Sequence, residues 1–406
     1  MTYKDFSNAN RKIACISAVL LGFSLPISTG LDSILLLLLL ITASLGWHIQ
    51  YTSLVYQNSV AKSALMLFFI LLIGCFYGNS TPTEGFKVLG KYDDLLLFGL
   101  LLPIFSNSQL RRYGQYAFMI AMGITMLLSY MIWLKVFEHT QFFSNRLPDN
   151  PVVFKLHITH GILMGFAAFA SAVYTIYSNS KMRWAMAIAS ILAISNVLLM
   201  TQGRTGYIVT FALTAYLIFS LFNWRKILLG LFLLIIASTL IYSTSPRLQS
   251  RIALSINEAE LWKPMQGNNE TSSIGTRMDY YTNTIKIIQK NPLLGVGTGG
   301  FETAYDKEII GTNVARSNNP HNQFLLFFAQ IGIVGLSAFL LLLTLAWQSA
   351  TRLPTMTETL LARGLLITIA TGCLFNSLLL DHTEGLFFAW LCGLLFSGLP
   401  SKNTLR

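Results

Sequence analysis

Residues 226–243 read KILLGLFLLIIASTLIYS, with a single charge at the first position. This run has the length that an α-helix needs to cross the hydrocarbon core of a bilayer, about 20 residues. Similar runs recur along the 406-residue chain, in which 53% of the residues are hydrophobic and 11% are charged. A soluble domain carries about 25% charged residues. The composition therefore excludes an ordinary soluble protein and predicts an all-α integral membrane protein.

The apolar runs predict about 12 transmembrane helices. No small-residue cleavage pattern follows the first run, so we interpret it as a membrane span rather than a signal peptide. On this reading, residues 1–243 hold nine spans, 244–319 form a long polar loop and 320–406 hold three spans. The predicted spans are 12–29, 31–49, 62–79, 92–106, 114–136, 157–178, 183–200, 206–222, 226–243, 322–347, 362–380 and 385–399.

The Lys and Arg residues indicate the orientation. Short cytoplasmic connections carry an excess of these residues, whereas long loops are translocated largely regardless of charge. With both termini in the cytoplasm, the basic residues of the short connections gather there, among them Lys62, Arg111, Arg225 and Arg363. The long loop then lies outside the cytoplasm. Because this topology accounts for part of the net charge of +11, we expect no nucleic-acid partner.

No cofactor is indicated. The four cysteines lie inside apolar runs and are interpreted as small buried residues. No C-x-x-C or clustered His/Cys pattern suggests a metal site, and we expect none. The pattern Gly295-x-Gly-x-Gly follows no predicted strand and lies outside the cytoplasm, so we interpret Pro292 to Phe301 as a structural turn rather than a nucleotide loop.

The long loop contains one clearly predicted helix. Ser272 or Ser273 can cap it, and apolar residues recur at helical spacing until Asn291-Pro292 stops it. The loop ends in Asn319-Pro320-His321-Asn322, where proline suits the first turn of a helix and Asn319 is the expected cap. His321 is thus predicted at the N-terminus of a transmembrane helix, at the membrane surface.

Three side chains are candidates for a site at this surface. Arg204 lies in QGRTGY (202–207), where the glycines allow close backbone approach to an anion; the alternative is an arginine that reaches toward lipid phosphate. Arg277, in the predicted helix, is an anion ligand, a solvated surface charge or the partner of Asp279. His321 is either a structural hydrogen-bonding group or, at the positive end of a helix dipole, a neutral base.

This set of residues suits the displacement of a lipid-linked diphosphate from a sugar. Arginines bind a diphosphate bidentately and stabilise charge on the leaving oxygen, and a neutral histidine accepts the proton of the attacking hydroxyl. The apolar spans would hold a polyprenyl tail. We expect Tyr281, Asn322 and Asp381 to support the site, with a helix cap as the alternative for Asp381. Charges within the spans are too few for an ion relay, which disfavours a flippase or transporter.

The order of four motifs resembles the O-antigen ligase/polymerase superfamily, and within it the lipopolysaccharide core–O-antigen ligases. The motifs are Arg204-Thr205-Gly206-Tyr207, the helix with Arg277, the turn from Pro292 to Phe301, and Asn319 to Asn322. The resemblance implies a GT-C-like glycosyltransferase of the bacterial inner membrane, acting at its periplasmic face.

The resemblance also implies the reaction and its residues. O-antigen would move from an undecaprenyl-diphosphate-linked glycan donor to a lipid A–core acceptor, with inversion and without metal or nucleotide, among membrane lipids. Arg204 and Arg277 correspond to diphosphate ligands and His321 to the catalytic histidine, whereas no role is carried over to Asp381. An O-antigen polymerase and a protein O-oligosaccharyltransferase use the same donor, and the sequence leaves the acceptor open among the three.

Overall fold

The computed structural model describes residues 3–45, 52–136, 150–178, 181–263 and 273–400, and within these ranges every regular element is a helix. Each predicted span overlaps one of these helices. They are α1 (Tyr3–Ser24), α2 (Thr29–Ser44), α4 (Ser59–Gly74), α6 (Asp94–Phe105), α7 (Ser108–Trp133), α8 (His157–Tyr177), α9 (Met182–Ser195), α10 (Arg204–Leu221), α11 (Trp224–Thr244), α15 (Gln323–Ala350), α16 (Met356–Cys373) and α17 (His382–Phe396).

Among the described residues, six helices are long and apolar enough to cross a membrane: α7, α8, α9 with the turn that follows it, α10, α11 and α15. Three others, α2, α4 and α17, are apolar but shorter. The prediction of a helical, multi-pass membrane protein is confirmed. The number of 12 spans and the GT-C-like fold stay predictions.

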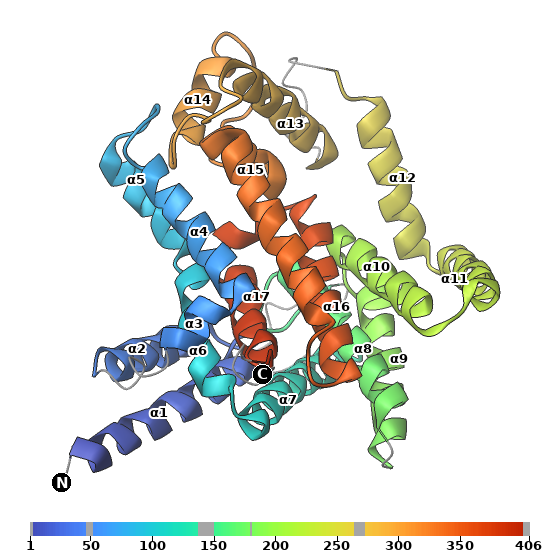
Figure 1. Cartoon of the computed structure of the whole chain (residues 1–406). Coiled ribbons are helices and arrows are strands. Elements are labelled where there is room, and N and C mark those ends of the chain that lie inside the picture. The colour runs from blue at the N-terminus through green and yellow to red at the C-terminus, as the bar shows by residue number, and fades with distance from the viewer. Residues whose placement is uncertain (1–2, 46–51, 137–149, 179–180, 264–272, 401–406) are drawn as a thin grey trace.

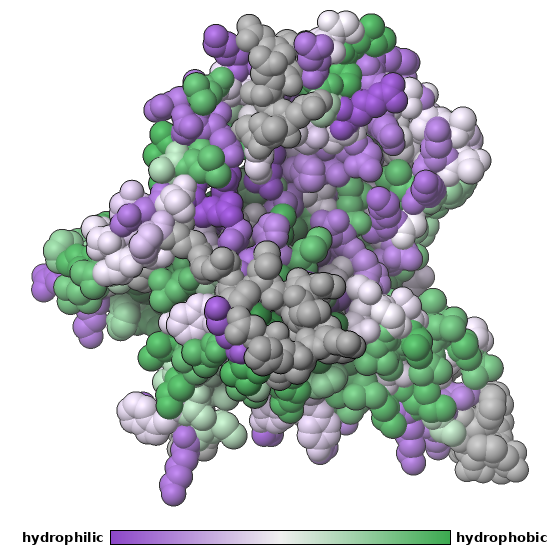
Figure 2. All heavy atoms as spheres, turned by 180° about the vertical axis from the view of Figure 1, so that it is seen from behind, coloured by the Kyte–Doolittle hydropathy of each residue, from purple (hydrophilic) through white to green (hydrophobic). Residues whose placement is uncertain are grey.

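Three helices of the predicted polar loop gather at one end of the molecule: α12 (Pro246–Glu260), α13 (Ser273–Lys290) and α14 (Phe301–Glu308), as Figure 1 shows. Figure 2 shows hydrophilic side chains over the upper part of the rear face and mainly hydrophobic ones below. The predicted helix around Arg277 is therefore present as α13, and it ends directly before Asn291. This hydrophilic end is where the candidate residues are found.

Helix α17 lies in the core. It is apolar nearly all round, and every residue from Thr383 to Phe396 is buried, as expected for a helix surrounded by others. Trp390 is fully buried, and its Nε1 donates a hydrogen bond to the carbonyl of Ala18 at 2.8 Å. A side chain at Gly22 would collide with the Trp390 ring, because its Cβ would lie 2.3 Å from Cζ2. The glycine therefore sets how closely α1 approaches α17.

The glycine-rich turn connects α13 to a break in α15. Helix α15 is interrupted at Ile331 and Gly332, and Gly332 has a φ of +63°. The amides of Val296 and Gly297 donate to the carbonyls of Ala329 and Gln330, at 2.9 and 2.8 Å, and so satisfy acceptors near the break. The turn is thus structural, as predicted, and it fixes the polar end of the protein onto α15.

Helix α11 is the most exposed of the long helices. None of the residues in its apolar window is buried inside the protein. One side of it nevertheless faces α10 and α12, as Figure 1 shows. A long helix that is apolar and uncovered is expected to contact lipid.

The start of α15 differs from the prediction. Asn322, not Asn319, caps the helix: its Oδ1 accepts a hydrogen bond from the amide of Leu325 at 3.0 Å, and the first helical residue is Gln323. Asn319 Oδ1 instead accepts from the amide of His321 at 2.9 Å, which closes a turn in front of the helix. Because this turn uses the Asn319 side chain, the helix does not begin at Pro320.

Candidate active site

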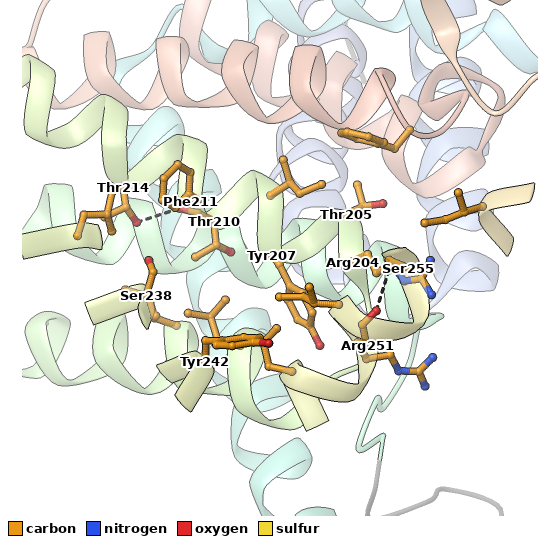
Figure 3. Close-up of a pocket in the computed structure, with 18 of the residues that line it drawn as sticks. Arg204, Thr205, Tyr207, Thr210, Phe211, Thr214, Ser238, Tyr242, Arg251 and Ser255 are labelled. Carbon is orange, nitrogen blue, oxygen red and sulfur yellow. Dashed lines mark hydrogen bonds between the residues drawn. The ribbon is translucent and has the colours of Figure 1, made fainter. Parts of the chain in front are cut away.

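A cavity of about 970 Å³ lies between α9, α10, α11, α12 and α13. Figure 3 shows Arg204 and Arg251 at one end and Phe211 and Thr214 toward the other. Most of the wall is apolar; Leu198, Phe211 and Leu234 belong to it. The cavity therefore combines a cationic end with a long hydrophobic channel.

Arg204 is the first residue of α10 and lines the cationic end. A π-helical turn (Asn196–Met200) and the extended Gly203 precede it. Gly206 lets α10 approach α8, since a Cβ there would lie 2.8 Å from the Cα of Gly161. Arg204 Nη1 is buried without a hydrogen bond, and Glu258 Oε2 lies 3.5 Å from it. An unsatisfied buried donor is costly, so this nitrogen is ready to bind an anion.

Arg277 lines the same end of the cavity from α13. Burial lowers its pKa; Tyr281 opposes this effect, and the charge of Arg204 adds to it. A guanidinium in a protein nevertheless stays protonated. Its predicted alternative partner, Asp279, is buried and accepts a hydrogen bond from Nε1 of Trp262 at 3.0 Å. Arg277 and Arg204 are therefore two positive charges that face one cavity.

The sequence reasoning missed a third arginine and an acid. Arg251 lines the cavity from α12 and donates a hydrogen bond to Oε1 of Gln202, the residue that opens the QGRTGY motif. Glu258 follows on the same helix, and its Oε2 also accepts from the amide of Ile274 at 3.1 Å. Ser245-Pro246 was the available signal: the serine caps α12, and residues seven apart on a helix share one face.

His321 lies beside this end in an unusual backbone conformation, with a φ of +52°. Its ring stacks on Tyr280, with centroids 5.7 Å apart and an angle of 19° between the rings. Burial lowers the pKa of His321, and the charge of Arg277 acts in the same direction. The imidazole is therefore favoured in its neutral form, in agreement with its place in front of the α15 N-terminus.

Tyr281 and Asn322 join the histidine to the cavity. The hydroxyl of Tyr281 and Nδ2 of Asn322 both donate to the carbonyl of Leu374 at 3.0 Å. Tyr281 also lines the cavity, and its hydroxyl donates to the carbonyl of His321 at 3.4 Å. Burial raises the pKa of Tyr281, so the phenol keeps its proton. The structure thus brings together five of the six predicted residues.

Asp381 is the exception. It is not among the residues that line the cavity, and it occupies the N-cap position of α17 without a side-chain cap hydrogen bond. Burial raises its pKa, and Lys91 opposes the shift. The position is that of the cap alternative, but the side chain does not make the hydrogen bond of a cap, so both roles stay predictions. In the described part of the chain, no group of three or more His, Cys, Asp or Glu residues could hold a metal ion.

Residues 188–340 match the family model described as O-antigen ligase. The match confirms the resemblance to the O-antigen ligase superfamily. It covers all three cavity arginines and His321, so the part of the chain that is similar to O-antigen ligases is the part that carries the candidate site. A protein of Haemophilus influenzae, described as uncharacterized, is 23% identical over 291 residues, which are 69% of this chain and 69% of that protein.

Proposed function

We propose that the protein transfers O-antigen from undecaprenyl diphosphate to lipid A–core at the periplasmic face of the bacterial inner membrane, with both termini in the cytoplasm. The observation that carries this proposal is the cavity in which Arg204, Arg251 and Arg277 meet a long apolar channel. A polyprenyl diphosphate has the same division into an anionic head and a hydrophobic tail. The family match supports the enzyme class.

The arginines would hold the diphosphate and stabilise the charge that develops on the leaving oxygen. Guanidinium groups bind phosphates bidentately, and their effect is strongest where water is excluded. Glu258 is the one carboxylate paired with them among the described residues, so the end of the cavity keeps an excess of positive charge. We propose that this charge makes a metal ion unnecessary.

His321 would act as the general base. The acceptor hydroxyl attacks the anomeric carbon, its proton moves to the imidazole, and the bond from that carbon to the diphosphate oxygen breaks. The diphosphate leaves with the bonding electrons on its oxygen. Attack from the face opposite the leaving group inverts the anomeric centre. The neutral form favoured for His321 is the form that can accept the proton.

The lipopolysaccharide of a deletion strain tests the proposal. It distinguishes a ligase from an O-antigen polymerase and from a protein O-oligosaccharyltransferase. Loss of ligation leaves a core without O-antigen and accumulates lipid-linked polymer. Loss of a polymerase leaves a core that carries one repeat unit. Normal lipopolysaccharide with an unglycosylated protein would point to a protein O-oligosaccharyltransferase, and would contradict the proposed acceptor.

A further inference from the structure

A second cavity, of about 640 Å³, lies between α7, α8 and α9 and shares no lining residue with the first. It is lined largely by apolar side chains, and it is unusually rich in methionine. The methionines are Met119, Met122, Met126, Met164, Met182 and Met186. Methionine is flexible and polarizable, and it adapts to ligands of varied shape. The lining therefore suits a hydrocarbon chain better than a rigid ligand.

The side chains that line this groove change from polar at one end to apolar at the other. Tyr116, Tyr174 and Ser178 line it at the end where α8 stops and α9 starts. Met126, Met164 and Ala193 line it deeper between the helices. Hydroxyl groups therefore occupy one end and purely apolar side chains the other. A lipid has the same order, with its ester groups next to its acyl chains.

The groove is about as deep as one leaflet. The helix rises 1.5 Å per residue, so Tyr116 and Met126 on α7 are separated by about 15 Å. The hydrocarbon core of a bilayer is about 30 Å thick, which leaves about 15 Å for each leaflet. An acyl chain that enters at the hydroxyl end would thus extend through the hydrocarbon part of one leaflet.

Two arginines adjoin lining residues at the hydroxyl end: Arg112 contacts Tyr116, and Arg183 directly follows Met182. The guanidinium of Arg112 donates to the hydroxyl of Tyr116 at 3.3 Å, and Arg183 lies over the exposed ring of Trp184. Neither arginine is bridged to a carboxylate in the described part of the chain, whereas the adjacent Arg111 is bound to Glu358 at 2.8 Å. Two unbridged arginines at the mouth provide a binding place for a phosphate.

We propose that this groove binds an anionic phospholipid, with its phosphate at Arg112 and Arg183 and one acyl chain along the methionines. Short loops rich in Lys and Arg lie on the cytoplasmic side, and the leaflet there carries anionic lipids. The ligand is therefore a lipid of the cytoplasmic leaflet. This site lies at the opposite end of the spans from the arginines of the first cavity, and it does not depend on the proposed transfer reaction.

Native mass spectrometry of the full-length protein in detergent tests the proposal, with phosphatidylglycerol and phosphatidylcholine as probes. We expect phosphatidylglycerol to bind more tightly. Arg112→Gln and Arg183→Gln should each weaken it about fivefold, since one basic residue near an anionic surface contributes about that factor. Arg225→Gln is the matched control: Arg225 also lies over a neighbouring tryptophan, Trp224, but no residue adjacent to it in the sequence lines either of the two cavities, whereas Arg183 directly follows Met182 of the groove.

Gly123→Phe separates occupation of the groove from surface attraction. Gly123 lines the groove, and a Cβ there would meet no atom within 4 Å, so a larger side chain starts in open space and can extend into the groove. We expect this variant to unfold at the same temperature as the wild type or higher, and to lose the bound phospholipid. Equal binding of both lipids, unchanged binding by Gly123→Phe, or recovery of a polyprenyl phosphate in place of phospholipid would overturn the proposal.

Discussion

Glu258 Oε2 lies 3.5 Å from Arg204 Nη1 and also accepts the amide of Ile274 at 3.1 Å. One carboxylate oxygen thus contacts the first residue of α10 and the first turn of α13, the helix that carries Arg277. It places a negative charge beside the guanidinium that, in the proposed reaction, binds the diphosphate. Glu258 and the donor would therefore compete for Arg204.

Replacing Glu258 by glutamine should strengthen donor binding. The amide keeps the size of the side chain but removes the charge that repels a diphosphate. A partly exposed ion pair contributes about 0.2–1 kcal/mol, so we expect Kd for the donor to fall by up to about fivefold. Titration of purified protein with a polyprenyl diphosphate measures this. Weaker binding would show instead that Glu258 holds Arg204 in its active position.

Arg204→Lys and Arg277→Lys should each lose most of the transfer activity. A lysine keeps the charge but cannot reproduce the planar fork that binds two phosphate oxygens. Loss of one such stabilising donor typically costs about 10²–10³-fold in kcat. Arg316→Lys is the control, because Arg316 is exposed and 3.7 Å from Asp306, away from the cavity. Transfer that is abolished by EDTA and restored by magnesium would contradict the metal-free scheme.

His321→Ala should reduce transfer by about 10²–10⁴-fold while protein levels and donor binding persist. The direction in which the transfer rate changes with pH shows whether His321 acts as a base. Burial and Arg277 lower the pKa of His321 below its ordinary value of about 6.5, so the base is unprotonated at pH 7 and transfer should fall only as the pH drops through that lowered value. A rate that instead falls with rising pH would make His321 a cationic phosphate ligand.

Gly332→Ala should destabilise the protein more than Gly311→Ala. Both glycines have a positive φ, +63° and +78°, which costs about 1–2 kcal/mol for an L-residue. At Gly332 the added Cβ would also lie 2.0 Å from the carbonyl oxygen of Leu293, whereas at Gly311 it would meet nothing within 4 Å. Thermal unfolding in detergent compares the two variants. Equal losses would show that the turn does not hold the break in α15.

Cysteine labelling tests the orientation. Asn257 on α12 and Arg225 in the first turn of α11 are both exposed, and we expect an impermeant thiol reagent added to intact cells to modify Asn257→Cys but not Arg225→Cys. Background should be low, since Cys75, Cys373 and Cys392 are buried and Cys15 is half-buried. Labelling at 225 with protection at 257 would reverse the proposed topology.

Hydrophobic patterning was enough to predict the helical membrane class, because a span must be apolar whatever surrounds it. Helix α13 was also predictable, since it starts at a serine and stops at Asn291-Pro292. The cap of α15 was predicted wrongly: Asn319 and Asn322 are both good caps, and the choice depends on the turn that Asn319 makes with His321. Local sequence does not contain that information.

The site was predictable only where local sequence motifs point to its residues. Arg204, Arg277 and His321 stand in recognisable motifs, and these motifs brought them to notice. Arg251 and Glu258 lie in α12, which has no such motif; Arg251 lines the cavity and Glu258 contacts Arg204 only because α12 packs beside α13 and the turn before α10. Ser245-Pro246 and the seven-residue spacing predict the helix and the face that the two residues share, but contacts between segments distant in sequence decide that this face meets the cavity.

The exposure of α11 bears on how a lipid could enter and leave the first cavity. It lines the first cavity with Leu234, Ala237 and Tyr242, while none of its apolar window is buried by other helices. On that side, α11 alone therefore separates the cavity from the surrounding bilayer. In the proposed reaction, a spent polyprenyl carrier would leave sideways past α11 and diffuse away in the plane of the lipid, without passing the polar cap of α12 to α14.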